Sequence, residues 1–233
     1  MPEDRPPFFS TFDEAWRWFV SGGTLTSMEM WRERLTAGRA QFLSFQVPIT
    51  DAPIADAVED LQHELSDIAG LAMFEREMLH ISVRGVGFQV ISKKRQDDVT
   101  REDVGRITKR ASTQLRDAKA AAIEVGPVNI FHDALILEVH DAGALADLRQ
   151  RLADAPDDTF GIAGGQYLPH ITIAMFADPA AAAPALRARL PQLRARPPIA
   201  TKIARIELAR WWFTGHEATF PERDPVRSYK LRS

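Results

Sequence analysis

The chain has 233 residues, a formal net charge of −3 at pH 7, 45% hydrophobic residues and no cysteine. This length suits one large domain or two closely packed lobes with a substantial core. The near-neutral charge excludes a bulk basic field that would hold the protein on nucleic acid or a membrane, so an anionic ligand must meet a local cluster. The absence of cysteine excludes disulfides and thiolate metal sites.

No segment has the length or composition of a membrane span or a secretory signal. No apolar run approaches the ~20 residues that a membrane-spanning helix needs. The start of the chain is acidic and proline-rich and has no apolar core of the kind that signal peptides carry. We therefore expect a cytoplasmic protein with no membrane contact, and no obligatory protein partner is evident.

Residues 1–38 predict two short helices, which we expect to form an N-terminal helical extension. The first helix ends at Gly22-Gly23. The second begins with Thr26 and Glu29, a capping-box pattern in which side chains satisfy free backbone N–H groups, and it ends at Gly38. The pattern gives this extension no role of its own.

From residue 39 to about residue 131 the chain predicts an alternation of strands and helices. Apolar residues at every second position indicate half-buried strands, and apolar residues three and four apart indicate amphipathic helices. In chain order we expect a strand over 43–49, a helix over 51–70, an extended segment over 71–83, a strand over 88–91, a helix over 100–115 and a strand over 123–130.

The same order of elements recurs from residue 132 to about residue 215. An internal repeat of this kind predicts two lobes related by approximate two-fold symmetry. We therefore expect one domain over 39–233 with interleaved lobes, and its glycine-rich segment 155–166 is expected to be a mobile loop next to a site. The expected elements are a strand over 135–139, a helix over 145–152, an extended segment over 168–176, a helix over 178–196 and a strand over 203–213.

Two of the six histidines lie in matching contexts, LHISV around His80 and PHITI around His170. Side chains alternate between the two faces of a strand. His80 and Ser82 therefore share one face, and so do His170 and Thr172. The isoleucine between each histidine and its hydroxyl residue points into the core.

This arrangement fits the cleavage of a phosphodiester. The reaction needs a base to activate the attacking oxygen and an acid to protonate the leaving oxygen, and histidine can do either near neutral pH. The hydroxyls of Ser82 and Thr172 can donate hydrogen bonds to phosphate oxygens and stabilise developing charge. One such unit from each lobe would flank the phosphorus atom from opposite sides.

A single His-x-Ser/Thr tripeptide is a weak signal, because about one is expected by chance among six histidines. Either histidine alone is better explained as a strand residue hydrogen-bonded by its neighbours. Both copies, however, lie in alternating apolar strands at equivalent points of a repeat. This coincidence favours the catalytic interpretation of His80 and His170.

The two segments resemble the paired H-x-T/S signature of the 2H phosphoesterase superfamily, which includes RNA 2′,3′-cyclic phosphodiesterases and the so-called 2′-5′ RNA ligases. The resemblance covers about residues 39–215, and the second copy, YLPHITIA, is the closer match. It implies an α+β fold with two pseudo-symmetric lobes whose antiparallel sheets line a central cleft. It also implies that His80 and His170 are catalytic and that Ser82 and Thr172 bind phosphate.

Two further residues are candidates for substrate contact. Arg84 is expected on the same face as His80, although an arginine also ends many strands in solvent. Tyr167 precedes the second motif, where it either stacks on a base or packs at the rim of the cleft. The aromatic run 211–213 is better explained by packing, and the basic run 93–95 by a solvated turn.

His63 lies off the apolar face of its helix, and we expect it at the surface. Three other histidines have no hydroxyl partner two residues on and are expected to be structural: His132, His140 and His216. No HExxH motif or carboxylate cluster predicts a metal site, and no glycine-rich phosphate loop predicts ATP-dependent ligation. We therefore expect neither a metal nor another cofactor.

The sequence thus predicts a metal-independent phosphodiesterase that acts on a 2′,3′-cyclic phosphate or a 2′-5′ linkage of RNA ends or nucleotides. A non-catalytic nucleotide- or RNA-binding module with the same fold is the main alternative, and any ligase activity would be the reverse of cleavage. Coincidental resemblance of the two strands is a third alternative. The near symmetry of the motifs leaves open which histidine is the acid.

Overall fold

The protein is described by a computed structural model over residues 9–27, 29, 38–153, 167–213 and 222–233. Its centre is a curled sheet with the strand order β10-β9-β1-β3-β7-β6-β5-β8, in which every neighbouring pair is antiparallel. In chain order the elements are α1 (Phe12–Val20), β1 (Gln41–Pro48), α3 (Ala52–Glu64), β2 (Leu71–Met73), a 3-10 turn (Arg76–Met78), β3 (His80–Gln89), β4 (Asp98–Val99), α4 (Arg101–Gln114), β5 (Ala121–Ile130), β6 (Ala134–His140), α5 (Ala144–Arg151), β7 (His170–Phe176), α6 (Pro179–Leu193), β8 (Ile199–Ile203), β9 (Arg205–Trp212) and β10 (Glu222–Lys230).

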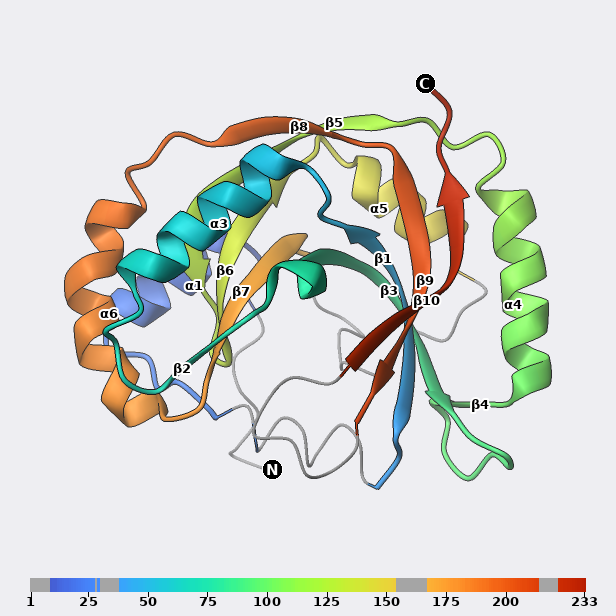
Figure 1. Ribbon diagram of the computed structural model, residues 1–233, viewed down its shortest axis with the longest axis horizontal. Coiled ribbons are helices and arrows are strands. Elements are labelled where there is room, and N and C mark those ends of the chain that lie inside the picture. The colour runs from blue at the N-terminus through green and yellow to red at the C-terminus, as the bar shows by residue number, and fades with distance from the viewer. Residues whose placement is uncertain (1–8, 28, 30–37, 154–166, 214–221) are drawn as a thin grey trace.

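The order of the strands is symmetric about the centre of the sheet (Figure 1). The strands β10-β9-β1-β3 form one half, which we call the His80 lobe, and β7-β6-β5-β8 form the other, the His170 lobe. The two halves meet where β3 runs antiparallel to β7 through the pair Ile81–Ile171. The α+β fold class with two pseudo-symmetric lobes is therefore confirmed, and α1 lies outside the repeated elements.

Two helices, α3 and α5, are exchanged between the halves. α3 follows β1 in the chain, yet its Gln62 Nε2 donates 2.8 Å hydrogen bonds to the carbonyl oxygens of Phe74 and Ile173 in the His170 lobe. α5 follows β6, yet its Arg149 Nη1 donates a 2.8 Å hydrogen bond to the Val83 carbonyl of β3. In Figure 1, α3 therefore lies with α6 on the side of β6 and β7. α4 stays beside β4 of its own half.

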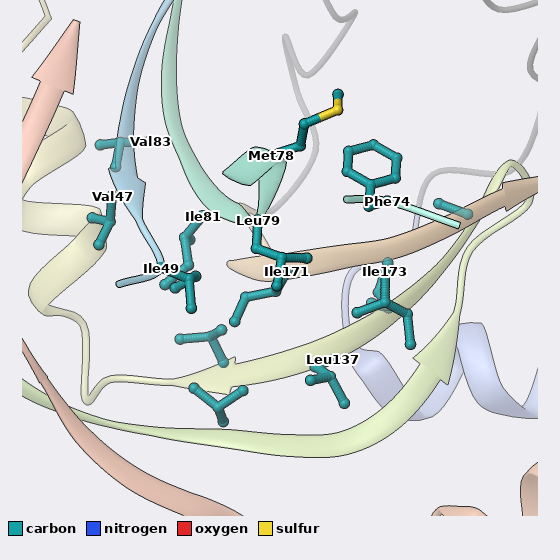
Figure 2. Close-up of a cluster of buried hydrophobic side chains, with 14 of the residues drawn as sticks. Val47, Ile49, Phe74, Met78, Leu79, Ile81, Val83, Leu137, Ile171 and Ile173 are labelled. Carbon is teal, nitrogen blue, oxygen red and sulfur yellow. The ribbon is translucent and has the colours of Figure 1, made fainter. Parts of the chain in front are cut away.

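The core continues across the junction of the lobes. Ile81 and Ile171 are fully buried, and Figure 2 shows them in one cluster with Leu79 and Leu137. Burying each such aliphatic side chain contributes roughly 1.5–3 kcal/mol. Because the isoleucines face this core, the residues on either side of them in each strand must face the other way.

Two strand boundaries differ from the prediction. The extended segment expected over 71–83 is interrupted, because a 3-10 turn over Arg76–Met78 lies between β2 and β3. The turn is closed by a 3.0 Å hydrogen bond from the Met78 N–H to the Glu75 carbonyl. It lets the chain leave the end of β7, where β2 pairs, and continue as β3 beside the start of β7.

The break expected between the extended segment 71–83 and the strand 88–91 does not form, and β3 runs from His80 to Gln89. Gly87 has a φ of +125°, and a Cβ added there would lie 2.3 Å from the carbonyl oxygen of Asp97. Glycine is therefore required for the close approach of the chain around Asp97, and it does not mark the end of a strand.

Other elements also begin or end at residues that differ from the prediction. The helix expected over 51–70 ends at Glu64, where hydrogen bonds tighten from i−4 to i−3 partners, as in the 3.0 Å bond from Ile68 N–H to the Leu65 carbonyl. The sequence did not predict β8 or β10. The expected second N-terminal helix, apart from a few residues near its start, and the expected loop over 155–166 lie outside the described residues.

Candidate active site

The two motif histidines are the first residues of the two central strands, His80 in β3 and His170 in β7. Ile81 pairs with Ile171 across the antiparallel junction, so the side chains that flank these isoleucines emerge on the opposite face. His80 and His170 are diagonal neighbours in this pairing, and diagonal neighbours in a regular antiparallel pair lie roughly 7–8 Å apart. The register therefore brings both histidines, with Ser82 and Thr172, to one face of the junction.

Each imidazole is held by the backbone of its own strand. His80 Nδ1 lies 2.7 Å from the Met78 carbonyl oxygen, and His170 Nδ1 lies 2.8 Å from the Leu168 carbonyl oxygen. A carbonyl accepts only, so Nδ1 carries the proton and donates it in both residues. In the neutral form this leaves the lone pair on Nε2, which is the nitrogen available for proton transfer.

The two hydroxyls differ in their contacts. The Ser82 Oγ lies 3.1 Å from His80 Nε2, and its O–H donates to that nitrogen in the neutral imidazole. The Thr172 hydroxyl makes no hydrogen bond to any residue that the structure describes. Ser82 is exposed and Thr172 half-buried, so both hydroxyls border solvent.

An aromatic ring packs against each histidine. The Trp211 ring centroid lies 4.9 Å from that of His80, and the Phe131 centroid lies 4.9 Å from that of His170 in an edge-on arrangement. Trp211 belongs to β9 and Phe131 directly follows β5, which are equivalent strands in the symmetric order. Packed rings restrict the imidazole rotamers and remove water from one side of each ring.

Burial lowers the pKa of His80 from its usual 6.5 to about 4. Desolvation is the largest cause, and the positive charges of Arg223 and His170 lower the pKa further, while the hydrogen bond to the Met78 carbonyl opposes them. A half-buried imidazole beside cations resists a second proton. His80 is therefore neutral at pH 7.

Burial also lowers the pKa of His170, but the surrounding charges act in the other direction. The hydrogen bond to the Leu168 carbonyl and the negative charge of Asp133 both raise the pKa and oppose desolvation. The two lobes therefore place opposite charges near two otherwise similar imidazoles.

Arg84 and Tyr167 are both engaged at the junction. Arg84 donates 3.4 Å hydrogen bonds to the carbonyl oxygens of Arg149 and Ala153 at the end of α5. Tyr167 Oη donates a 2.6 Å hydrogen bond to the Ser82 carbonyl, and the guanidinium carbon of Arg149 lies 5.0 Å from its ring centroid. Through these contacts Tyr167 packs at the edge of the site. Contact of Arg84 or Tyr167 with a substrate stays a prediction.

The residues expected to be structural have ordinary surroundings. His63 is exposed on α3, His132 Nε2 lies 3.6 Å from the Asp133 carboxylate, and His140 Nε2 lies 3.1 Å from Glu138. The basic run 93–95 is an exposed turn, and His216 lies outside the described residues. Among the residues that are described, no three His, Asp or Glu side chains gather as a metal site.

Sequence reasoning missed the residues that set the environment of the imidazoles. Arg223 of β10 lies with its Nη2 2.5 Å from Glu207 of β9 and donates from Nη1 to the Glu77 carbonyl at 3.1 Å. Asp133 and Phe131 lie in the turn between β5 and β6. None of these positions belongs to a motif, and only the strand pairing brings them to the histidines.

No helix in the described segments combines the length and apolar character needed to cross a bilayer. Comparison with solved structures shows where the fold occurs elsewhere. The protein TT0787 of Thermus thermophilus superimposes with a TM-score of 0.58 at 15% identity, covering 82% of this chain and 98% of that one. E. coli LigT complexed with ATP gives a TM-score of 0.59 at 14% identity, covering 84% and 99%.

A third structure, titled a phosphoesterase, gives a TM-score of 0.58 at 14% identity and covers 83% of this chain and 99% of that one. No curated protein sequence matches significantly. The model of the 2′-5′ RNA ligase superfamily matches residues 50–212, which is more than half of the chain and spans both histidine motifs. The chain therefore belongs to the 2′-5′ RNA ligase superfamily, within the 2H phosphoesterases.

Proposed function

We propose that the protein is a metal-independent phosphodiesterase that hydrolyses 2′,3′-cyclic phosphate or 2′-5′ phosphodiester bonds of RNA ends or nucleotides. The main support for the proposal is that the same backbone hydrogen bond fixes both imidazoles. Both Nδ1 atoms donate to the carbonyl two residues earlier, so both Nε2 atoms are left for proton transfer on one face of the β3–β7 junction. A chance pair of strand histidines has no reason to share this geometry.

In the proposed reaction one Nε2 accepts a proton from water as the water oxygen bonds to phosphorus. The bond from phosphorus to the departing ribose oxygen breaks, and the Nε2–H of the second imidazolium protonates that oxygen. Ser82 and Thr172 donate hydrogen bonds to the non-bridging oxygens, where negative charge grows. The bound phosphate anion raises the pKa of both histidines, so that one of them can carry the required proton.

The charges around the histidines support a division of roles. His80 has a pKa of about 4 and lies near Arg223, so it is neutral and suited to act as the base. Asp133 favours the protonated form of His170, which suits the acid. Hydrolysis consumes no reducing equivalent or nucleotide energy, so the residues present account for each proton that moves.

The structural relatives support a nucleotide as the class of ligand. The related LigT was crystallised with ATP, with 3′-AMP and with NADP+, each of which carries phosphate on a nucleoside. At 13–14% identity these structures share the fold with this chain. The choice between cyclic ends and 2′-5′ linkages is left to the assay.

The test is turnover in EDTA on 2′,3′-cyclic mononucleotides and on short RNAs with cyclic ends or one 2′-5′ linkage. We expect His80→Ala and His170→Ala each to lower kcat at least ~10²-fold, the usual scale for loss of an acid or base. His63→Ala, a histidine on α3 outside the site, is the matched control and should retain wild-type activity. If both active-site variants hydrolyse every substrate as fast as the wild type, the proposal is wrong.

The same assay separates the binding module from the enzyme. Tight nucleotide binding without product from any substrate would indicate a non-catalytic role. Formation of a 2′-5′ linkage from a cyclic end and a 5′-hydroxyl, lost in both histidine variants, would show that the site also runs the reaction in reverse.

A further inference from the structure

A groove with a volume of about 810 Å³ lies in the His80 lobe between α4 and the strands β9 and β10, away from both histidines. Among the described residues that line it, four are cationic, three carry hydroxyls and none is an Asp or a Glu. The cationic residues are Arg101, Lys109, Arg210 and Arg227.

The groove opens on the face of the sheet opposite the histidines. Trp211 packs against His80, so its neighbour Arg210 must point to the other face of β9. Tyr229 of β10 marks the same face, because its Oη donates a 3.3 Å hydrogen bond to the Thr108 carbonyl of α4. The groove is therefore a separate site and not an extension of the catalytic face.

The cations of the groove are poorly neutralised. In the described part of the chain, no carboxylate lies within 4 Å of the charged groups of Arg101, Lys109 or Arg227. Arg210 Nη1 lies 3.6 Å from Asp224, which is a weak contact. Like charges that face one groove without counterions repel one another and attract an anion.

The floor of the groove also contains unsatisfied polar groups. Among the described residues, the buried atoms Gln89 Oε1 and Arg210 Nε have no hydrogen-bond partner. A buried polar atom without a partner costs about 1–3 kcal/mol. The Gln89 amide can present its NH2 group by rotation, and both side chains can then donate to an anion in the groove.

The spacing of the cations fits an extended ligand. Arg101 and Lys109 are eight residues apart on α4, which corresponds to about 12 Å along the helix axis. One phosphate group could contact both only if the two side chains bent toward each other. A chain of phosphates can contact both with the side chains apart.

We propose that this groove binds the sugar–phosphate backbone of a single RNA strand. The proposal rests on the proposed function and deepens it, because it makes an RNA chain, and not only a mononucleotide, the ligand of this protein. The described part of the lining has no aromatic ring on which a base could stack, so the contact is with the backbone and is independent of sequence. An acidic peptide fits less well, because Val104 and Val226 are the only apolar side chains among the described lining residues.

The test is the fluorescence anisotropy of a labelled 12-nucleotide single-stranded RNA with a 3′-hydroxyl end, titrated with the protein in EDTA. We compare Lys109→Glu/Arg227→Glu with Arg116→Glu/Lys202→Glu, which makes the same change of charge at exposed residues outside the groove. If charge reversal impairs folding, as judged by circular dichroism and Tm, the neutral variant Lys109→Gln/Arg227→Gln replaces Lys109→Glu/Arg227→Glu.

We expect the groove variant to bind RNA at least tenfold more weakly than the wild type and the control to change less than threefold. Loss of two phosphate contacts should reduce the slope of log K against log salt by about 1.4, at ~0.7 for each contact on a single strand. Equal weakening in both variants, or no RNA binding by the wild type, overturns the proposal. So does competition by a poly-glutamate peptide of equal charge as strong as that by unlabelled RNA.

The outcome does not depend on catalysis. If the groove variant weakens RNA binding but no substrate is turned over, the groove proposal stands and the proposed enzymatic function is wrong. If turnover requires both histidines but RNA does not bind in the groove, the enzymatic function stands and the groove proposal is wrong.

Discussion

The two halves of the molecule repeat the geometry of the histidine site but not its electrostatics. Each half supplies a histidine at the start of a central strand, a carbonyl that fixes the tautomer and a ring at 4.9 Å. The charges nearby are opposite, with Arg223 lowering the pKa of His80 and Asp133 raising that of His170. Symmetry of the backbone thus places two similar imidazoles, and local side chains give them different electrostatic surroundings.

The supports behind the aromatic rings differ as well. Trp211 is held within the sheet, where its Nε1 donates a 3.3 Å hydrogen bond to Ser44 Oγ of β1. Phe131 is held by the segment that precedes the repeat, since it stacks with Phe9 and Phe12 at ring distances of 6.0 and 6.3 Å. The described part of the extension therefore supports the ring behind His170.

The largest expected effect concerns the two hydroxyls. If both hold phosphate, Ser82→Ala and Thr172→Val each lower kcat about 10²-fold, the usual effect of losing one donor that stabilises a developing oxyanion. Steady-state kinetics on the best substrate measure it, with Ser66→Ala, an exposed hydroxyl in the turn after α3, as the control. Loss from only one variant would mean that the lobes do not share the phosphate.

A second effect compares the buried ion pairs of the two lobes. Glu138 in the His170 lobe is 3% exposed and lies 2.5 Å from Arg194 Nη1. Arg194→Ala leaves this carboxylate without its cation, which should cost about 3 kcal/mol in the free energy of unfolding. The exposed pair Arg151–Asp147 is the control, and Arg151→Ala should cost less than about 1 kcal/mol in the same urea titration.

Glu207 in the His80 lobe should tolerate the matching change better. It is paired with Arg223 and also lies 3.4 Å from Arg205 Nε, so Arg223→Gln leaves it one cation. Equal destabilisation by Arg194→Ala and Arg223→Gln would contradict this difference between the lobes.

The third effect tests the support from the extension. Phe12→Ala removes one ring from the stack behind Phe131, and the looser Phe131 should displace His170 and lower kcat by up to about tenfold. Phe12→Leu retains apolar volume and should recover most of the activity. If Phe12→Ala changes Tm but not kcat, the extension stabilises the fold without positioning His170.

The smallest effect is a shift of the pH profile. Arg223→Gln removes a positive charge that disfavours the imidazolium of His80, so the pKa of His80 should rise above about 4. A base works only when deprotonated, and the acid limb of kcat/KM should therefore move to higher pH, by up to about one unit. Asp133→Asn removes a negative charge from His170 and should lower its pKa, as NMR titration of the imidazoles would show.

The sequence was sufficient for the local part of this site. Alternation in the strands predicts that Ile81 and Ile171 are buried and that the histidines and hydroxyls face away from them, and the packing confirms the burial. The repeated order of elements likewise predicts two lobes, and the resemblance to the 2H phosphoesterases implies the α+β fold that the structure has. These features depend on residues that are close together in the chain.

The parts that the sequence did not predict depend on contacts between distant residues. The exchange of α3 and α5 between the lobes leaves no trace in their apolar periodicity, because either sheet could bury the same face. Arg223 and Phe131 affect the imidazoles only through strand pairing across the sheet. The sequence did not predict that β3 continues through Gly87, because the close approach of the chain at Asp97 cannot be inferred from local composition.

The central claim is that His80 and His170 act as one unit across the junction of the lobes. The most direct test is the rate of a single turnover for His80→Ala, His170→Ala and the double variant on one phosphodiester. Residues that act together are strongly non-additive, so we predict that the double variant is no more than about tenfold slower than the slower single variant. Losses that multiply in the double variant would show that the histidines act independently and would contradict the account.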